Sequence, residues 1–356
     1  MTSISKVDIS LLAIKFDTPR GGSGVRQIDI IVSEITDEDG ATGLGFSYVI
    51  GGGAAIPAAI AENLANRFLD GTPLGHPEAH WKTIHASFNR TGGGPNLIAL
   101  AALDIGLWDL HAKRANNSLS VAMGGTGEPV PVYGSGDFSP AMEPVQAADI
   151  AVAHRESGFR GVKPRVNAQP ADAAVMQAVR AAVGDDIAVM VDANEKGDLM
   201  RASRLLAAAA DAGVMFVEEP LPAGNLLGYR TLAASAPVAI ASGEHLQGHD
   251  RFAALMADRI VSTIQPDLAM AGGLTPCLEV ARSADAFGVV VAPHFLPGLF
   301  THFAGVTTSG LWVEDFPLLE EAFEGWPEMA ADGTIAAREV SGHGLRLTDA
   351  ARKARV

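Results

Sequence analysis

Apolar and polar residues alternate along the first fifty positions in the way that half-buried β-strands require. The alternation occurs in three runs, at residues 5–16, 26–36 and 42–48. The segment Asp37-Glu-Asp-Gly40 between the last two runs has the composition of a hairpin turn. Apolar residues then recur at helical spacing in three further runs, at residues 54–69, 76–88 and 94–115. The pattern predicts a three-stranded antiparallel sheet followed by three helices, of which the last is apolar nearly all round and therefore buried.

A different pattern fills the middle of the chain, where short runs of β-forming residues alternate with Ala-rich runs of helical spacing. The β-like runs begin near residues 131, 161, 188, 214, 238, 260, 289 and 310. The helical runs between them are clearest at residues 171–183, 197–212 and 273–287. Eight strands bridged by helices are typical of a (β/α)8 barrel, although the helix after the last strand is doubtful. Beyond residue 315 the pattern is irregular, and residues 342–347 resemble a strand that returns to the first domain.

These two patterns divide the chain into domains. Asn116, Asn117 and the pair Gly124-Gly125 end the first pattern, and a new strand begins at Val130. We therefore expect an α+β domain at residues 1–128, a barrel at residues 129–315 and a C-terminal segment at residues 316–356 that returns to the first domain. A chain of 356 residues suits a barrel with an accessory domain.

The composition narrows the classes of partner. Acidic residues outnumber basic ones by 41 to 26, which gives a formal charge of −15, and no Lys/Arg run could follow a phosphate backbone. This disfavours nucleic acid as a partner. An anionic substrate would need a local positive centre, which a bound divalent cation could supply. Most of the surplus acidic residues simply favour solubility.

A cytoplasmic location is expected from three features. Cys277 is the single cysteine, which excludes an internal disulfide and a thiolate metal site and fits a reducing compartment. The N-terminal residues lack the basic and apolar regions of a signal peptide. No apolar run has the roughly 18 to 20 residues that a membrane span needs.

Acidic residues follow three successive β-like runs at equal intervals. Asp192 follows Ala-Val-Met-Val, and Glu218 and Glu244 come 26 and 52 residues later, each near the end of an apolar run. In a parallel barrel, such residues point into one shared mouth. Three convergent carboxylates repel one another unless a cation neutralises them, and oxygen ligands favour Mg²⁺, with Mn²⁺ as the alternative. A strand-end carboxylate often only caps a helix, but that explanation suits one residue better than three.

Two further residues form a candidate acid–base pair. Asp267 follows the sixth β-like run and His294 follows the seventh, so we expect them to be neighbours. A carboxylate beside an imidazole fixes its tautomer and raises its basicity, which a general base requires. A lone histidine in such a place is more often a packing residue, and the pairing with Asp267 favours catalysis.

Other polar side chains belong to the same predicted mouth. Lys163 and Arg165 lie two apart on the second run, so they face the same way and suit an anionic ligand; Pro164 between them places the pair at the strand's end. Glu314 closes the eighth run, where it could contact a substrate oxygen if protonated or ion-pair with Lys163. Asn194 and the neighbouring Glu195 are candidate polar contacts.

Together these residues resemble the mandelate racemase group of the enolase superfamily, which includes acid-sugar dehydratases. The likeness covers nearly the whole chain and consists of the Lys163 and Arg165 pair, three carboxylates in the order of the metal ligands, the His–Asp dyad and Glu314. The resemblance implies a modified (β/α)7β barrel of TIM type under an α+β capping domain formed by both chain ends, and a homo-oligomer. It also implies abstraction of the proton α to the carboxylate of a small-molecule substrate through a metal-stabilised enolate. In that scheme the metal chelates the substrate carboxylate, Lys163 and Glu314 contact its oxygens, and His294 is the base.

One departure from the family pattern bears on the reaction. Racemases of the group carry a second lysine where this chain has Arg165, and a guanidinium is a poor proton acceptor. Dehydration of a sugar acid to a 2-keto-3-deoxy acid, with His294 as the only base, is therefore the main hypothesis. Epimerisation or racemisation, lactone cycloisomerisation, and a binding protein whose catalysis has lapsed are the alternatives.

Substrate selectivity in the group resides in loops of the capping domain. Those loops correspond to residues 18–24 and 47–53 here, which are rich in glycine. Arg20 and Arg26 could meet a distal carboxylate of the substrate, although both also suit an ordinary surface position.

Overall fold

The N-terminal sheet matches the alternation in the sequence. In a computed structural model that describes residues 2–20 and 24–355, its strands are β1 (Ile4–Arg20), β2 (Val25–Asp37) and β3 (Thr42–Ile50). Both pairings are antiparallel, and the predicted hairpin joins β2 to β3, with Gly40 at a φ of 85°. The predicted three-stranded sheet is therefore confirmed, with β1 longer than expected.

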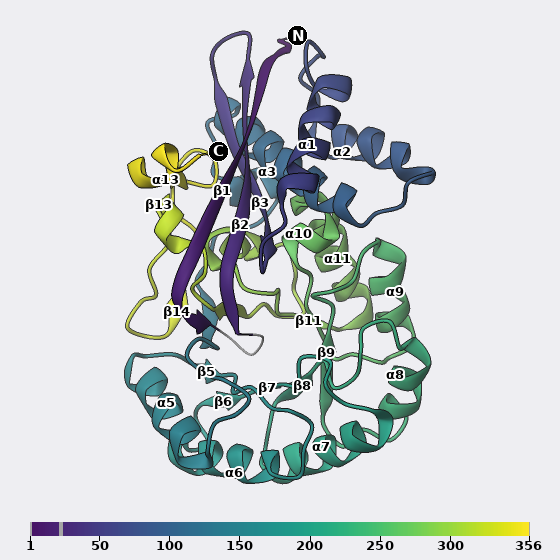
Figure 1. The fold of residues 1–356 in the computed structure, drawn as a ribbon, viewed down its shortest axis with the longest axis vertical. Helices are drawn as coiled ribbons and strands as arrows, with labels where there is room; N and C mark the ends of the chain where they lie inside the picture. The colour runs from purple at the N-terminus through teal and green to yellow at the C-terminus, as the bar shows by residue number, and fades with distance from the viewer. Residues whose placement is uncertain (1, 21–23, 356) are drawn as a thin grey trace.

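The three predicted helices are also confirmed and pack beside this sheet (Figure 1). They are α1 (Ala55–Phe68), α2 (Pro77–Ala86) and α3 (Pro95–Arg114). A short helix η1 (Ser87–Asn89) lies between α2 and α3, and another, α4 (Leu119–Met123), follows α3. Helix α3 is buried along most of its length. It lies so close to β3 that a Cβ atom on Gly45 would come within 2.0 Å of the Ala102 carbonyl oxygen. Glycine at this position therefore permits the contact between sheet and helix.

Short parallel strands alternate with helices through the middle of the chain. The strands are β4 (Val130–Gly134), β5 (Gly161–Val162), β6 (Ala188–Val189), β7 (Val191–Asp192), β8 (Phe216–Glu218), β9 (Ala239–Ser242), β10 (Thr263–Ile264), β11 (Val290–Val291) and β12 (Val313–Asp315). The helices are α5 (Pro144–Glu156), α6 (Asp172–Val183), α7 (Leu199–Asp211), α8 (Leu226–Ala233), α9 (His249–Ala257), α10 (Leu268–Ala271), α11 (Leu274–Phe287), α12 (Pro297–Phe300) and η2 (Thr301–Phe303). The predicted sequence of strands and helices is confirmed, and the doubtful helix directly after the last strand is replaced by an irregular segment.

Strand order shows how these units assemble. One sheet has the order β11-β10-β9-β8-β7 and the other β12-β4-β5-β6, and all of these pairings are parallel. Isolated parallel bridges connect Arg165 with Asp192 and Val291 with Leu311. Helices α5 to α9 form the outer layer, and the lower ends of β1 and β2 reach toward these strands from above in Figure 1.

The C-terminal segment departs from the prediction. Its elements are η3 (Glu320–Ala322), β13 (Phe323–Glu324), β14 (Thr334–Ile335), β15 (Arg346–Leu347) and α13 (Asp349–Lys353). Of the strand expected at residues 342–347, only β15 forms, and it pairs with β13 rather than with the N-terminal sheet. Gly342 and Gly344 have φ values of 77° and 78°, which interrupt an extended backbone. The segment nevertheless contacts the first domain, because the backbone N–H of His343 donates to Asp109 at 3.0 Å.

A buried histidine near this contact makes folding sensitive to pH. In His302, Nδ1 lies 3.0 Å from the Ser120 hydroxyl and Nε2 lies 3.3 Å from the His343 carbonyl oxygen. Burial lowers the pKa of His302 to about 3. The unfolded chain binds this proton near pH 6.5 and the folded chain does not, so stability is complete above that pH and declines as the pH falls.

Because of this histidine, we expect the free energy of unfolding to fall by about 2 kcal/mol between pH 7 and pH 5. The decrease is about 1.4 kcal/mol for each pH unit below pH 6.5. Urea denaturation at the two pH values measures the loss, and a His302→Gln variant should show a correspondingly smaller loss. Equal losses in the two proteins would contradict the assignment.

None of the helices in the described ranges has the length and apolar character needed to cross a membrane.

Candidate active site

The three predicted acidic residues lie side by side at one end of the parallel strands. Asp192 and Glu218 are the last residues of β7 and β8 and pair directly across the two strands. Glu244 comes two residues after the end of β9. Asp192 and Glu218 are fully buried and Glu244 is 8% exposed. The equal spacing in the sequence thus corresponds to adjacent strand ends, as expected.

Two buried cations compensate much of this negative charge. Lys163 Nζ lies 2.6 Å from Glu218 Oε2 and 2.8 Å from Glu314 Oε1, and Arg165 pairs with Asp192. Burial disfavours the charge of Arg165, but Asp192 and Glu314 outweigh it and raise the pKa of the guanidinium. Burial likewise opposes ionisation of Glu314, yet Lys163 above all lowers the pKa of that carboxyl to about 2. In this structure Glu314 therefore forms the ion pair with Lys163, one of the two arrangements expected for this residue.

The acidic trio keeps ligand capacity that the protein does not use. Glu218 Oε1 and Glu244 Oε2 are buried and have no hydrogen-bond partner. Burial and the charge of Asp192 raise the pKa of Glu218 well above its usual range, and burial also raises that of Glu244. Unpaired carboxylate oxygens that resist ionisation are what a hard divalent cation would relieve. The donor set therefore fits a magnesium ion.

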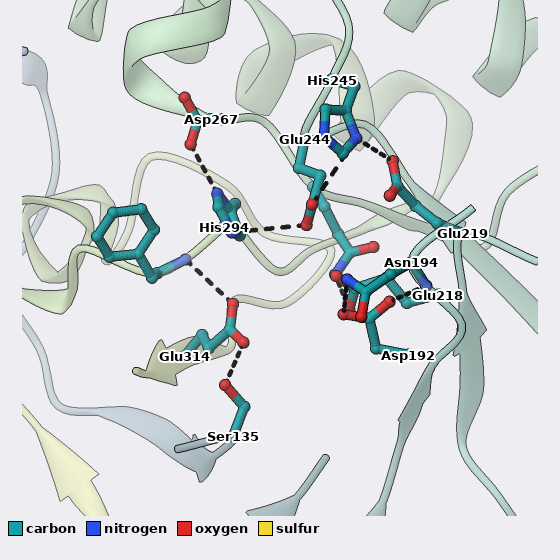
Figure 2. Close-up of polar contacts among 12 residues, drawn as sticks. Ser135, Asp192, Asn194, Glu218, Glu219, Glu244, His245, Asp267, His294 and Glu314 are labelled. Carbon is teal, nitrogen blue, oxygen red and sulfur yellow. Dashed lines mark hydrogen bonds and ion pairs between the residues drawn. The ribbon is translucent and has the colours of Figure 1, made fainter. Parts of the chain in front are cut away.

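The predicted acid–base pair forms beside this trio (Figure 2). His294 Nδ1 lies 2.7 Å from Asp267 Oδ2, and its Nε2 points toward Glu244 Oε2 at 3.6 Å. Burial lowers the pKa of His294, but the charge of Glu244 and the hydrogen bond to Asp267 outweigh burial and raise it to about 10. A cation bound by Glu244 would cancel part of this charge and bring the pKa of the imidazole toward neutral, the range in which an imidazole can act as a base.

A cavity of about 460 Å³ opens over these groups. Five described residues of the first domain line it, namely Val25, Tyr48, Val49, Ile50 and Ile98. The remaining lining residues are Arg165, Asn194, Glu195, Glu244, His245, Asp267, Ala269, Met270, His294 and Phe316. His294 and one member of the trio, Glu244, therefore face a space between the two domains that a small molecule could occupy.

Comparison with known proteins agrees with this geometry. Residues 21–124 match the model of the mandelate racemase / muconate lactonizing enzyme N-terminal domain, and residues 146–351 match that of the enolase C-terminal domain-like family. The chain belongs to the enolase superfamily. Within it, the chain is a member of the mandelate racemase group.

Relatives in the superfamily include dehydratases and a cycloisomerase. The chain is 31% identical to L-talarate/galactarate dehydratase of Salmonella typhimurium over 98% of its own length and 90% of the relative's. It is 30% identical to 3,6-anhydro-alpha-L-galactonate cycloisomerase of Streptomyces coelicolor, over 90% and 89% of the two chains. L-talarate dehydratase from Polaromonas sp. JS666, solved with Mg and L-glucarate, superimposes with a TM-score of 0.93 at 31% identity, over 100% and 98% of the two chains. The fold is thus a TIM-like α/β barrel with an N-terminal cap domain.

In this enolase-superfamily chain, the cap supplies a contact that the sequence did not suggest. The Tyr48 hydroxyl, on β3, donates to Asp267 Oδ2, the same oxygen that contacts His294. The Tyr48 ring also packs edge-on against Phe295 with centroids 4.9 Å apart. Only the three-dimensional fold brings Tyr48 and Asp267 together, because 219 residues separate them.

A second His–carboxylate pair was also missed. His245 Nδ1 lies 2.9 Å from Glu219 Oε1. Among the described residues, Glu195, Glu219 and His245 form a group in which each residue offers one possible metal-ligand atom and these three atoms lie within 4.8 Å of one another. The hydrogen bond with Glu219 raises the pKa of His245 to about 9. The ion pair by itself accounts for the closeness of His245 and Glu219. The signal was present in the sequence, since Glu219 and His245 directly follow Glu218 and Glu244.

The candidate substrate contacts divide into two groups. Asn194 and Glu195 line the cavity, and the Asn194 side chain donates to Asp192 at 2.9 Å. Arg20 instead donates to the Pro317 carbonyl oxygen at 2.8 Å and lies 3.6 Å from Glu321, whereas Arg26 is exposed. Neither arginine is among the described residues that line the cavity, so their contact with the substrate stays a prediction.

Tyr48→Phe should lower kcat about tenfold with little change in KM, because loss of one hydrogen bond of roughly 1.4 kcal/mol frees Asp267 to reorient and displace the base. Steady-state kinetics on an active substrate measures the split. Tyr229→Phe is the matched control, because it removes another buried tyrosine hydroxyl. That hydroxyl donates to the Leu221 carbonyl oxygen at a distance of 2.7 Å, and Tyr229 does not line the cavity. An equal effect of both changes would reduce the role of Tyr48 to packing.

Proposed function

We propose that the protein is a magnesium-dependent enzyme that removes the proton α to the carboxylate of a sugar acid and dehydrates the acid to a 2-keto-3-deoxy acid. The observation that carries this proposal is the position of the His294–Asp267 dyad, which faces the same cavity as Glu244 of the acidic trio. Structures of relatives with bound Mg, and relatives named as acid-sugar dehydratases, support the choice of ion and reaction.

Each residue of the site has a role in this scheme. Asp192, Glu218 and Glu244 would hold Mg²⁺, or Mn²⁺ as the alternative ion. The bound cation supplies positive charge against the negative charge that develops on the substrate carboxylate. Lys163 and Arg165 hold the carboxylates of the trio and of Glu314 in place and add positive charge beneath the cavity. Asn194 restrains Asp192 through two hydrogen bonds.

His294 performs the proton transfers. Asp267 accepts from Nδ1 and leaves Nε2 directed at the cavity, so Nε2 removes the α-proton and then returns it to the departing β-hydroxyl. Arg165 remains protonated and cannot act as a second base from the opposite side. This asymmetry favours one-base dehydration over racemisation.

The same assignment extends to the barrel type, the domain boundaries, the oligomeric state and the location of the protein. The barrel is of the modified (β/α)7β type, residues 1–128 and 316–356 form the cap, and residues 129–315 form the catalytic domain. The contact between His343 and Asp109 supports the return of the C-terminal segment to the cap. The protein acts as a homo-oligomer in the cytoplasm on a small-molecule carboxylate.

Product analysis in D₂O tests the reaction. The magnesium-loaded protein is incubated with a library of sugar acids and lactones, and the products are identified by NMR. A 2-keto-3-deoxy acid is expected. An epimer that has gained deuterium and kept its hydroxyl would show epimerisation instead of dehydration. A ring-opened lactone would show cycloisomerisation, the alternative that a relative named as a cycloisomerase favours. Absence of any α-proton exchange across the library would show a binding protein without catalysis.

A further inference from the structure

The cavity wall that the cap contributes is apolar. It consists of Val25, Val49, Ile50 and Ile98, together with Tyr48, whose hydroxyl is already bound to Asp267. Ile50 is 37% exposed and lines the cavity. We call the four aliphatic residues the cap wall. Because the dyad and the trio belong to the barrel, the end of a substrate remote from its reacting carboxylate meets this wall.

No cation is available to a second carboxylate among the described residues that line the cavity. Arg165 is paired with Asp192, His245 lies 2.9 Å from Glu219, and His294 lies 2.7 Å from Asp267. The acidic Glu195 also lines the cavity; one of its oxygens accepts from the backbone N–H of Ala223, and no described cation lies within ion-pair distance of it. An additional carboxylate would therefore meet negative charge and apolar surface.

In the part of the chain that the structure describes, the loops of the cap add no cation that could pair with a second carboxylate. Arg20 is held by Pro317 and Glu321, and Arg26 is exposed outside the cavity lining. The remaining loop residues 21–23 are Gly-Gly-Ser and carry no ionisable side chain. Burying a carboxylate against apolar side chains without a partner is strongly unfavourable, whereas a methyl group suits such a surface and an uncharged hydroxymethyl group loses far less than a carboxylate.

We propose that the substrate is a monocarboxylic sugar acid, an aldonate or a deoxyaldonate, whose end opposite the reacting carboxylate is uncharged, and that the cap wall excludes diacids. This inference rests on the proposed function and narrows it. It separates the protein from its relatives that are named for talarate and galactarate or solved with L-glucarate, all of which are diacids.

Matched substrate pairs provide the test. Each pair consists of an aldonate and the aldarate with the same configuration at every shared hydroxyl-bearing carbon, and kcat/KM is measured with the full-length, magnesium-loaded protein. For every pair that reacts, we expect the aldonate to be favoured by roughly a hundredfold or more, as for other sites that leave a polar group unpaired. An aldarate that reacts equally well or better would overturn the inference and leave the proposed function standing. Silence on both members of all pairs would remove the proposed function, and the inference with it.

A charge placed on the cap wall tests its location. Ile50→Arg should raise the ratio of kcat/KM for the aldarate to kcat/KM for the aldonate by about tenfold. A tenfold change corresponds to roughly 1.4 kcal/mol, which is the contribution expected from one partly exposed ion pair between the arginine and the distal carboxylate. Ile50→Gln is the control, since it adds polarity without charge and should leave the ratio nearly unchanged. If a folded Ile50→Arg protein, checked by its melting temperature, keeps the wild-type ratio, the cap wall does not face the distal end of the substrate and the inference fails.

Discussion

His294→Asn is expected to lower kcat by roughly a thousandfold or more, within the range that a general base contributes. Asparagine keeps a polar side chain near Asp267 but has no group that accepts a proton at neutral pH. Exchange of the substrate α-hydrogen with solvent should be lost together with turnover, because both require the same proton abstraction. Both rates are measured with the magnesium-loaded protein.

The same variant should bind metal almost as the wild type does, since His294 approaches Glu244 Oε2 only at 3.6 Å. Isothermal titration with Mg²⁺ or Mn²⁺ provides this measurement. His249→Asn is a suitable control, because His249 bonds to Ser283 and does not line the cavity. A His294→Asn protein that still exchanges the α-hydrogen would remove histidine from the role of base.

Asp192→Asn should weaken Mg²⁺ binding by roughly a hundredfold or more, which exceeds the usual effect of changing a residue that only supports a ligand. The substitution removes a negative charge and replaces one carboxylate oxygen of the trio with an amide NH₂. It also leaves Arg165 with its more distant partner Glu314, at 3.8 Å. Activity should fall in parallel and recover partly at high Mg²⁺ concentration, which a titration of rate against metal concentration would show.

Glu219→Gln is the discriminating control for this result. Glu219 belongs to the Glu195–Glu219–His245 group, whose ligand atoms also lie close together. We expect Glu219→Gln to change metal affinity much less than Asp192→Asn does. The reverse order, in proteins whose circular dichroism shows an intact fold, would place the metal at the other group.

The sequence was informative wherever chemistry follows the strand repeat. Asp192, Glu218 and Glu244 come at equal intervals because each unit of strand and helix has nearly the same length, so a strand-end position recurs in register. The same regularity brought Asp267 and His294 to neighbouring strand ends. Residues on one repeated unit can therefore be placed relative to those on the next without knowledge of the tertiary fold.

Contacts between the domains could not be predicted in this way. Tyr48 reaches Asp267 only because β3 lies over the ends of the barrel strands, and no local pattern records that approach. The sequence also did not show that Arg20 contacts Pro317 and Glu321, because these C-terminal residues lie about 300 positions away along the chain. The strand expected at residues 342–347 was shortened by glycines with positive φ, whose conformations are set by contacts distant in sequence.

The position of the metal is the central claim, and anomalous diffraction from crystals soaked with Mn²⁺ tests it most directly. We expect one strong anomalous peak within coordination distance of Asp192, Glu218 and Glu244, on the side of the cavity that His294 faces. A peak between Glu195, Glu219 and His245 instead, or no bound ion at a saturating Mn²⁺ concentration, would contradict the account.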